Sequence, residues 1–231
     1  MKILGICGSP RPEKISATYR ILDLLLKETG HEYELISLGN LKFSGCTACL
    51  GCAKDNVCKL HDDLSGVRDK IVGADAFVIG SPNYFSGISS LTHAFLERWF
   101  QFRHQEGKLV WGKLAVAVGV GSMGGAPVVG QIEKFMSYNL VKTVDTLSVN
   151  GNPSCFYCGY GKTCEMGVPK MTGIECPDPS HIPDILDDPD IRKSAVDAGA
   201  RLGRMLSGGY DRRLVALEMQ ELLSEHLRES V

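Results

Sequence analysis

Short, continuous apolar runs alternate with amphipathic segments along most of the chain. Continuous apolar runs are typical of parallel strands buried on both faces, and apolar residues three and four apart are typical of helices packed on a sheet. The predicted strands cover residues 2–6, 33–38, 75–82, 113–121 and 141–149. The predicted helices cover residues 16–27, 64–73, 89–103, 126–140, 190–206 and 211–227.

This alternation predicts an α/β fold with a doubly wound parallel sheet, in which right-handed crossovers place helices on both faces. The first helix directly follows the first strand, which suits a flavodoxin-like sheet of five strands in the order 2-1-3-4-5. We expect one such domain over residues 1–206 and a C-terminal helical extension over 207–231. The extension either packs on its own domain or contacts another subunit, because a short apolar stripe lies along it: Val215, Met219, Leu222 and Leu223.

Composition narrows the class of partner. The chain has 231 residues, 44% of them hydrophobic, and a formal net charge of −2. So small a charge gives no long-range attraction to nucleic acid or to an acidic membrane, and neither is expected as a partner. The N-terminal apolar run lacks the length of a signal peptide, and no apolar segment is long enough to span a bilayer. The sequence therefore predicts a cytoplasmic protein.

Nine cysteines are many for a chain of this length. In the reducing cytosol they favour metal binding or redox chemistry over a disulfide framework. Cys7 ends the first predicted strand and is expected to be a buried, inert thiol. The other eight fall into two irregular stretches, the cysteine-rich loops 44–62 and 150–188.

The first group is Cys46, Cys49, Cys52 and Cys58. Three thiols at every third residue can turn inward from one curled loop, as in ferredoxin-type runs, whereas structural zinc sites usually take two well-separated pairs. The spacing favours a 4Fe–4S cluster over zinc, and a redox disulfide would leave two thiols unexplained. Because the loop follows the second strand, we expect it along the carboxyl edge of the sheet.

The second group is Cys155, Cys158, Cys164 and Cys176. It combines a Cys-x-x-Cys pair with a spaced third thiol and a cysteine before Pro177, as in some ferredoxins. The fifth strand before it lies at the opposite margin of the predicted sheet, so the two groups are not expected to share one cluster. A second metal site, iron–sulfur or zinc, and free or redox-paired thiols are both open.

Three loops follow strands at the carboxyl edge, where doubly wound sheets bind ligands. Loop 8–20 precedes a helix N-terminus and carries hydroxyl and guanidinium donors, which suit a monophosphate, and it lacks the pattern of a triphosphate cradle. Loop 81–90 offers an amide, aromatic rings and a glycine, which suit a flat heteroaromatic ring. The glycine-rich loop 119–126 closes a third side. The candidate ligand-binding residues are Ser9, Arg11, Ser16, Ala17, Thr18, Pro82, Asn83, Tyr84, Phe85, Gly87, Ile88, Gly121, Ser122 and Gly124.

Three stretches in the order "GSPR…S-A-T", "CTACLGCAKDNVC…DD" and "ADAFVIGSPNYFSGISSLTHAFLER" resemble the iron–sulfur flavoproteins, a branch of the NADPH-dependent FMN reductase group. The resemblance covers residues 1–150 and implies a flavodoxin-like fold, bound FMN and a compact four-cysteine cluster motif. It implies that the FMN phosphate is held by Ser9, Arg11, Ser16 and Thr18. It also implies that the isoalloxazine is lined by Pro82, Asn83, Tyr84, Phe85 and Gly87. The phosphate loop is longer than in the family, with "PEKI" before Ser16.

Together these features predict an FMN- and iron–sulfur-dependent oxidoreductase that passes electrons between a reduced donor and an acceptor. The resemblance implies ferredoxin or NAD(P)H as the donor, and we expect a homo-oligomer, either a dimer or a tetramer. No side chain stands out as a general acid or base. Two alternatives stay open: a clusterless NAD(P)H-dependent FMN or quinone reductase, and a non-catalytic redox-sensing cysteine protein.

Overall fold

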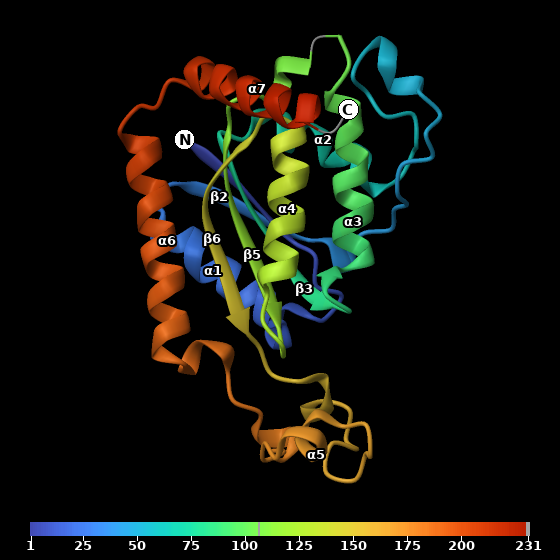
Figure 1. Cartoon of the computed structure of the whole chain (residues 1–231), viewed down its shortest axis with the longest axis vertical. Coiled ribbons are helices and arrows are strands. Elements are labelled where there is room, and N and C mark those ends of the chain that lie inside the picture. The colour runs from blue at the N-terminus through green and yellow to red at the C-terminus, as the bar shows by residue number, and fades with distance from the viewer. Residues whose placement is uncertain (106, 230–231) are drawn as a thin grey trace.

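The computed structural model describes residues 1–105 and 107–229. Its sheet has five parallel strands in the order β2-β1-β3-β5-β6. They are β1 (Lys2–Cys7), β2 (Glu32–Ser37), β3 (Ala76–Tyr84), β5 (Leu114–Gly121) and β6 (Lys142–Asn150). A two-residue strand, β4 (Gly87–Ile88), pairs antiparallel with the end of β3. Leaving β4 aside, this is the predicted order, and the flavodoxin-like fold is confirmed (Figure 1).

Helices cover both faces of the sheet (Figure 1). One face carries α1 (Ala17–Glu28) and α6 (Pro189–Ser207); the other carries α2 (Arg68–Gly73), α3 (Ser90–Glu97) and α4 (Ala126–Tyr138). Successive strand residues point to opposite faces, so Ile3 packs in the core under α1 and α6 while Leu4 packs in the other core. The continuous apolar runs of the sequence are thus explained by burial on both sides.

Two glycines of α6 allow it to lie directly on α1. A Cβ at Gly199 would fall 2.3 Å from the carbonyl oxygen of Leu25, and one at Gly203 would fall 2.2 Å from that of Thr29. Both positions are steric overlaps for any other residue. The contact between α6 and α1 therefore requires residues without a side chain at these two positions.

The predicted helix 89–103 is two elements. Helix α3 ends at Glu97, and Arg98–Phe102 continues as tighter 3-10 turns. These turns bury Trp99 and Phe102 in the core, and they direct Arg98 toward the first cysteine-rich loop.

Lys113 is a buried charge at the start of β5, with 1% of its surface exposed. Its Nζ donates to the carbonyl oxygens of Ile71 at 2.9 Å and Val72 at 2.7 Å, at the C-terminal end of α2. Burial, together with the nearby charge of Arg212, lowers the pKa of Lys113 to about 7. Lys113 thus satisfies two helix-end carbonyls at a cost that depends on pH.

The last helix, α7 (Arg212–Glu229), crosses the amino end of the sheet (Figure 1). Met219 is buried and Val215 packs on the domain, so this side of the stripe covers the chain's own core. Leu223 is half-buried, but Leu222 is 52% exposed. Within the described residues, no helix has both the length and the apolar character needed to cross a bilayer.

Candidate functional site

A cavity of ≈ 130 Å³ opens at the carboxyl edge of the sheet, where β1, β3 and β5 end. Each of the three predicted loops contributes to its wall, as does the chain after β6. The predicted residues that line it are Ser9, Arg11, Ala17, Thr18, Pro82, Asn83, Tyr84, Gly121 and Ser122. The predicted residues outside its lining are Ser16, Phe85, Gly87, Ile88 and Gly124. The sheet therefore gathers residues that are far apart in sequence into one cleft.

The N-terminus of α1 forms one end of the cleft. Ser16 caps the helix, because its Oγ accepts the N–H of Tyr19 at 3.2 Å, and the extra residues before it form a 3-10 turn. The hydroxyls of Ser9 and Thr18 are buried beside this turn, and Ser9 Oγ accepts the N–H of Arg11 at 3.3 Å. Helix N-termini with nearby hydroxyls and a guanidinium bind phosphate groups. This end of the cleft fits a phosphate monoester.

Asn83 forms the other end of the cleft with an amide group that has one free side. Its Nδ2 donates to the carbonyl oxygen of Gly124 at 2.7 Å, while its Oδ1 is buried and has no partner. A Cβ at Gly121 would lie 2.5 Å from the Asn83 Cβ, so the glycine lets the loop close on the amide. A buried acceptor without a donor is costly. A ligand with an N–H in its ring edge, as in the isoalloxazine of FMN, suits this oxygen.

A strained hairpin stands beside the cleft. The turn between β3 and β4 consists of Phe85 and Ser86, with φ values of 52° and 63°, although neither is a glycine. Such left-handed residues cost energy and tend to occur at functional sites. Phe85 is fully exposed, so its ring is not part of the cleft wall. Behind the turn, the N–H of Ile88 donates to Gln131 Oε1 at 3.1 Å and fixes β4 to α4.

The first cysteine-rich loop is closed at its base by a buried ion pair. Arg98 Nη1 lies 2.6 Å from Asp62 Oδ2, and Nη2 lies 3.2 Å from Asp62 Oδ1. Arg98 Nη1 also donates to the Ser44 carbonyl at 3.0 Å, and the Ser44 N–H donates to Asp62 at 3.3 Å. Burial raises the pKa of Asp62, but the hydrogen bonds from Arg98 and Ser44 hold it below the usual value. Arg98 thereby joins the two ends of the loop.

Two neighbours of Arg98 hold the cysteines themselves. Glu97 Oε2 accepts the N–H of Cys46 at 3.2 Å, and Gln101 Oε1 accepts the N–H of Cys58 at 3.1 Å. The first and last thiols of the group are thus fixed to consecutive turns of one segment. The last residue of α3, Glu97, and the 3-10 turns that follow it place the side chains of Glu97, Arg98 and Gln101 toward the loop.

The backbone around the thiols curls in the manner of an anion-binding loop. Ala48 and Leu50 have left-handed φ values of 54° and 56° on either side of Cys49, and the Ala48 N–H donates to Cys46 Sγ at 3.4 Å. Such alternation makes concave nests of N–H groups, which occur at phosphate and iron–sulfur sites. The Gly51 N–H and the Thr47 hydroxyl lower the pKa of Cys49, which favours its thiolate.

Cys52 is the buried member of the group. Burial raises the pKa of its thiol, and charge on Cys58, Cys46 and Cys49 would raise it further, so all three are electrostatic neighbours. Among the described residues, no three His, Cys, Asp or Glu side chains are gathered so as to hold a single metal ion. The chemistry of four thiols fits a cluster, and the sulfurs would have to draw together around it.

The position of this loop differs from the prediction. The expectation that it lies along the carboxyl edge is wrong, because Cys46 and Cys58 contact the far ends of α3 and its 3-10 extension. Cys46 also shares a groove with Tyr138 at the C-terminus of α4, whose N-terminus is at the cleft. That helix has 13 residues, or roughly 20 Å at about 1.5 Å per residue. Within one chain the thiol loop is therefore about one helix length from the cleft. Figure 1 shows the loop beside the end of α3 that lies away from the second cysteine-rich loop.

The second cysteine-rich loop, not the first, lies at the cleft. Gly151, Asn152, Ser154 and Tyr157 line the cavity, and the Arg11 guanidinium stacks 4.2 Å from the Tyr157 ring centroid. Sequence reasoning missed these residues because an irregular stretch gives no period from which to place a side chain. An aromatic residue between two cysteines after a strand end was the one available indication.

Known proteins of similar sequence share much of the chain. The model of the family described as NADPH-dependent FMN reductase matches residues 1–152. An iron–sulfur flavoprotein of Methanocaldococcus jannaschii is 32% identical over 169 residues, which is 70% of this chain and 82% of that protein. An iron–sulfur flavoprotein of Methanosarcina thermophila is 30% identical over 124 residues, which is 52% of this chain and 63% of that protein.

Solved structures share the fold at low sequence identity. RosB, in a crystal structure with a bound 8-demethyl-8-formylriboflavin-5'-phosphate intermediate, has a TM-score of 0.59 and 16% identity, and the match covers 100% of this chain and 88% of RosB. An azoreductase of Bacillus anthracis has a TM-score of 0.51 and 11% identity, over 88% of this chain and 99% of that one. These two likenesses establish the flavodoxin-like arrangement alone.

Proposed function

Because the chain belongs to the NADPH-dependent FMN reductase family, we propose that it is an oxidoreductase with two redox centres, FMN in the cleft and a 4Fe–4S cluster on the first cysteine-rich loop. The observation that carries the proposal is the clamped loop, in which Glu97, Arg98 and Gln101 fix a set of four thiols. The clamp holds the two ends of the loop together, which keeps its four thiols in one place, as a cluster site requires.

The cleft residues would bind and orient the cofactor. The N-terminus of α1, with Ser9 and Thr18, would hold the phosphate, and Arg11 would add its charge. Asn83 Oδ1 would accept a hydrogen bond from the ring edge and so fix the orientation of the isoalloxazine. Bound FMN accepts electrons as a pair and releases them singly, which is the chemistry that links a two-electron donor to a one-electron cluster.

The cluster ligands are Cys46, Cys49, Cys52 and Cys58, and the donor is ferredoxin or NAD(P)H. Cys46 and Cys49 are exposed and lie about one helix length from the chain's own cleft. That distance is long for electron transfer within one chain, so we also propose a homo-oligomer. In a dimer or tetramer the loop of one subunit can approach the cleft of another. The thiols of one subunit would then hold the cluster within reach of the flavin held in the cleft of another.

Metal, sulfide and flavin analysis of protein purified without oxygen tests this function. We expect four iron and four sulfide per chain beyond any iron held by the second loop, one FMN, and an EPR signal from the reduced cluster. A Cys49→Ser/Cys52→Ser variant should lose this iron and sulfide while keeping the flavin. A Lys54→Ser/Val57→Ser variant, which changes two exposed residues of the same loop, is the matched control and should keep both. Flavin-bound protein that carries zinc at the first loop, or no metal there, would contradict the proposal.

A further inference from the structure

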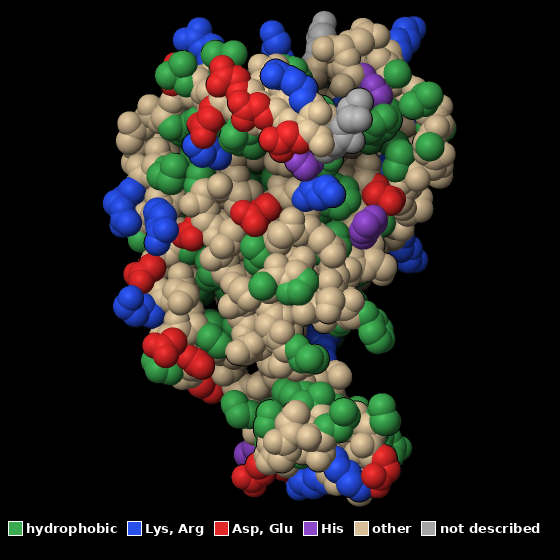
Figure 2. Space-filling view, in the orientation of Figure 1, with side chains coloured by type: hydrophobic (Ala, Val, Ile, Leu, Met, Phe, Trp, Pro, Cys, Tyr) green, Lys and Arg blue, Asp and Glu red, His purple; other side chains and the backbone are tan. Residues whose placement is uncertain are grey.

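Residues 151–184 form a lobe below the main body (Figures 1 and 2). Its only α-helix is α5 (Val168–Thr172), with five residues. Few of its side chains are buried, and Phe156 is the one large residue among them. Segments this small with so little core usually need a disulfide or a metal to hold one structure.

The lobe's apolar side chains do not compensate for the missing core. Tyr160, Met166, Met171 and Ile174 are between 50% and 80% exposed. The four cysteines are less exposed as a group, because Cys155, Cys164 and Cys176 are half-buried and only Cys158 is exposed. In the described part of the chain all nine cysteines are free thiols, so no disulfide holds the lobe together.

Two of the four thiols lie against one carbonyl group. Cys158 Sγ lies 3.4 Å and Cys176 Sγ lies 4.0 Å from the carbonyl oxygen of Cys155, although 21 residues separate Cys155 from Cys176. Gly161 fills the remaining side, since a Cβ there would lie 2.6 Å from Cys176 Sγ. Gly167 packs against Cys164 in the same way, with its added Cβ 3.4 Å from Cys164 Cβ. Glycines at both contacts bring separate turns of the chain close to the sulfurs.

Backbone N–H groups are directed at the sulfurs. The Val168 N–H donates to Cys155 Sγ, and the Tyr160 N–H donates to Cys158 Sγ, both at 3.4 Å. The second contact joins a thiol to the N–H two residues later, as Ala48 and Cys46 do in the first loop. Hydrogen bonds to the sulfurs are a regular feature of iron–sulfur sites. The lobe therefore shares this local contact with the first cysteine group.

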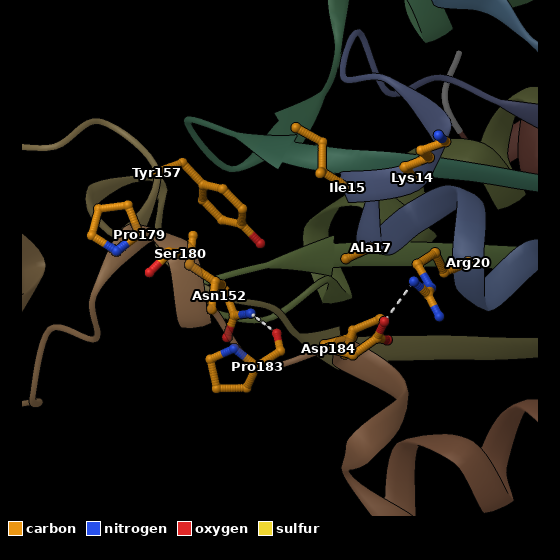
Figure 3. A pocket seen from close by; sticks show the side chains of 12 residues that line it. Lys14, Ile15, Ala17, Arg20, Asn152, Tyr157, Pro179, Ser180, Pro183 and Asp184 are labelled. Atoms are coloured by element: carbon orange, nitrogen blue, oxygen red, sulfur yellow. Dashed lines mark hydrogen bonds and ion pairs between the residues drawn. The ribbon is translucent and has the colours of Figure 1, made fainter.

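The lobe is also attached to the cleft. Asn152 Nδ2 donates to the Pro183 carbonyl at 2.8 Å, which ties its two ends together, and Arg20 of α1 pairs with Asp184 at 2.6 Å. Figure 3 shows these ends facing α1 across a second cavity of ≈ 240 Å³, with Tyr157 between that cavity and the first. Tyr157 lies between Cys155 and Cys158 in the chain, so whatever fixes these thiols fixes the wall of the cleft.

We propose that Cys155, Cys158, Cys164 and Cys176 bind one thiolate-coordinated metal centre, with zinc or iron as the metal, which stabilises the lobe and positions Tyr157 at the cleft. Among the described residues, no three potential ligands are close enough together to hold a metal ion. The sulfurs would therefore have to move toward one another when the metal binds. Four thiolates suit either metal. The proposal goes beyond the proposed function, since it concerns residues that the first cluster does not use.

Native mass spectrometry of the full chain, purified without oxygen, tests the proposal directly. We compare wild type with Cys158→Ser/Cys164→Ser and with the control Met166→Ser/Met171→Ser, which changes two exposed residues of the same lobe. The cysteine variant should lose one metal centre that the wild type and the control retain, and the mass of the lost centre distinguishes zinc from iron. Equal metal content in all three proteins, or a disulfide within the lobe, overturns the proposal.

A second readout remains usable if the cysteine variant does not fold. Chelator treatment of the wild type should speed proteolysis within 151–184, and metal-free protein should bind FMN about fivefold more weakly as the Arg11–Tyr157 contact loosens. Unchanged cleavage of the lobe after metal removal overturns the proposal. Iron at the first loop is scored separately through Cys49 and Cys52, so the proposed function can fail while the second centre stands.

Discussion

Removing the charge of Arg98 should destabilise the first cysteine-rich loop more than removing the charge of Arg103, which follows it on the same segment. Arg98 is 3% exposed and makes three N–H bonds, two to Asp62 and one to the carbonyl of Ser44. In an Arg98→Met variant the Asp62 carboxylate and the Ser44 carbonyl lose their donor, and the carboxylate is left partly buried without a counter-charge.

The magnitude follows from that burial. Removing one partner of a buried ion pair costs about 3–5 kcal/mol. The Asp62 side chain keeps 16% of its surface exposed, and its oxygens still accept the N–H groups of Ser44 and Leu64. Water and these donors relieve part of the cost, so we expect about 3 kcal/mol, which is roughly a 150-fold change in the unfolding equilibrium constant.

Guanidinium denaturation of Arg98→Met, Arg103→Met and wild type measures the effect. Arg103 is the matched control, because it follows Arg98 on the same segment but is exposed and only stacks 5.4 Å from the Tyr138 ring; its loss should cost less than about 1 kcal/mol. Adding Asp62→Leu to Arg98→Met should recover about 1–3 kcal/mol of the sum of the single effects. Equal losses for the two arginines, or additive effects of Arg98 and Asp62, would refute the clamp.

Other predictions test the fold and the cleft. Lys113 loses its proton near pH 10.4 in the unfolded chain but at a pKa of about 7 in the folded protein. Between these values the free energy of unfolding of the wild type, relative to that of Lys113→Met, should therefore rise with pH by at most about 1.4 kcal/mol per pH unit. A difference in urea denaturation that does not change with pH contradicts this. Ser86→Gly should stabilise the protein by about 1 kcal/mol, because φ is 63° there, and an unchanged urea midpoint would contradict the strain. Gly203→Ala should lower the free energy of unfolding by about 1–3 kcal/mol, because the added methyl group overlaps the end of α1. Gly130→Ala, on the open face of α4, should leave it unchanged or raise it. Similar effects of the two substitutions would show that α6 does not pack tightly on α1. Asn83→Ala should weaken FMN binding about tenfold through loss of one buried acceptor, and unchanged affinity in a fluorescence titration would remove Asn83 from the flavin contacts.

The sheet could be predicted from sequence because each strand is buried on both faces and leaves a continuous apolar run. Ile3 and Leu4 serve opposite cores, so neither can be polar. The order of the strands followed from the first helix coming directly after the first strand. The break in the helix 89–103 could not be predicted, because it serves a distant partner: Arg98 turns toward Asp62, which lies 36 residues earlier.

The cleft was predictable where strand ends define it and hidden where irregular chain completes it. Asn83 and Gly121 lie at the carboxyl ends of β3 and β5, whose pairing register fixes them at one edge. Tyr157 reaches the same cleft from an irregular lobe. Cys46 lies away from the cleft, beside the C-terminus of α3, and no local sequence pattern predicts the path of the loop that places it there. Ser16 was predicted at the phosphate, which stays a prediction; its hydroxyl caps α1, whose N-terminus forms that end of the cleft.

An anaerobic reductive titration tests the central claim most directly, because FMN accepts two electrons and a 4Fe–4S cluster accepts one. Wild type should take up one electron per chain more than the Cys49→Ser/Cys52→Ser variant, and the additional electron should bleach an iron–sulfur absorbance. The same electron count in the two proteins, each with its full flavin, would contradict an iron–sulfur cluster at the first cysteine-rich loop.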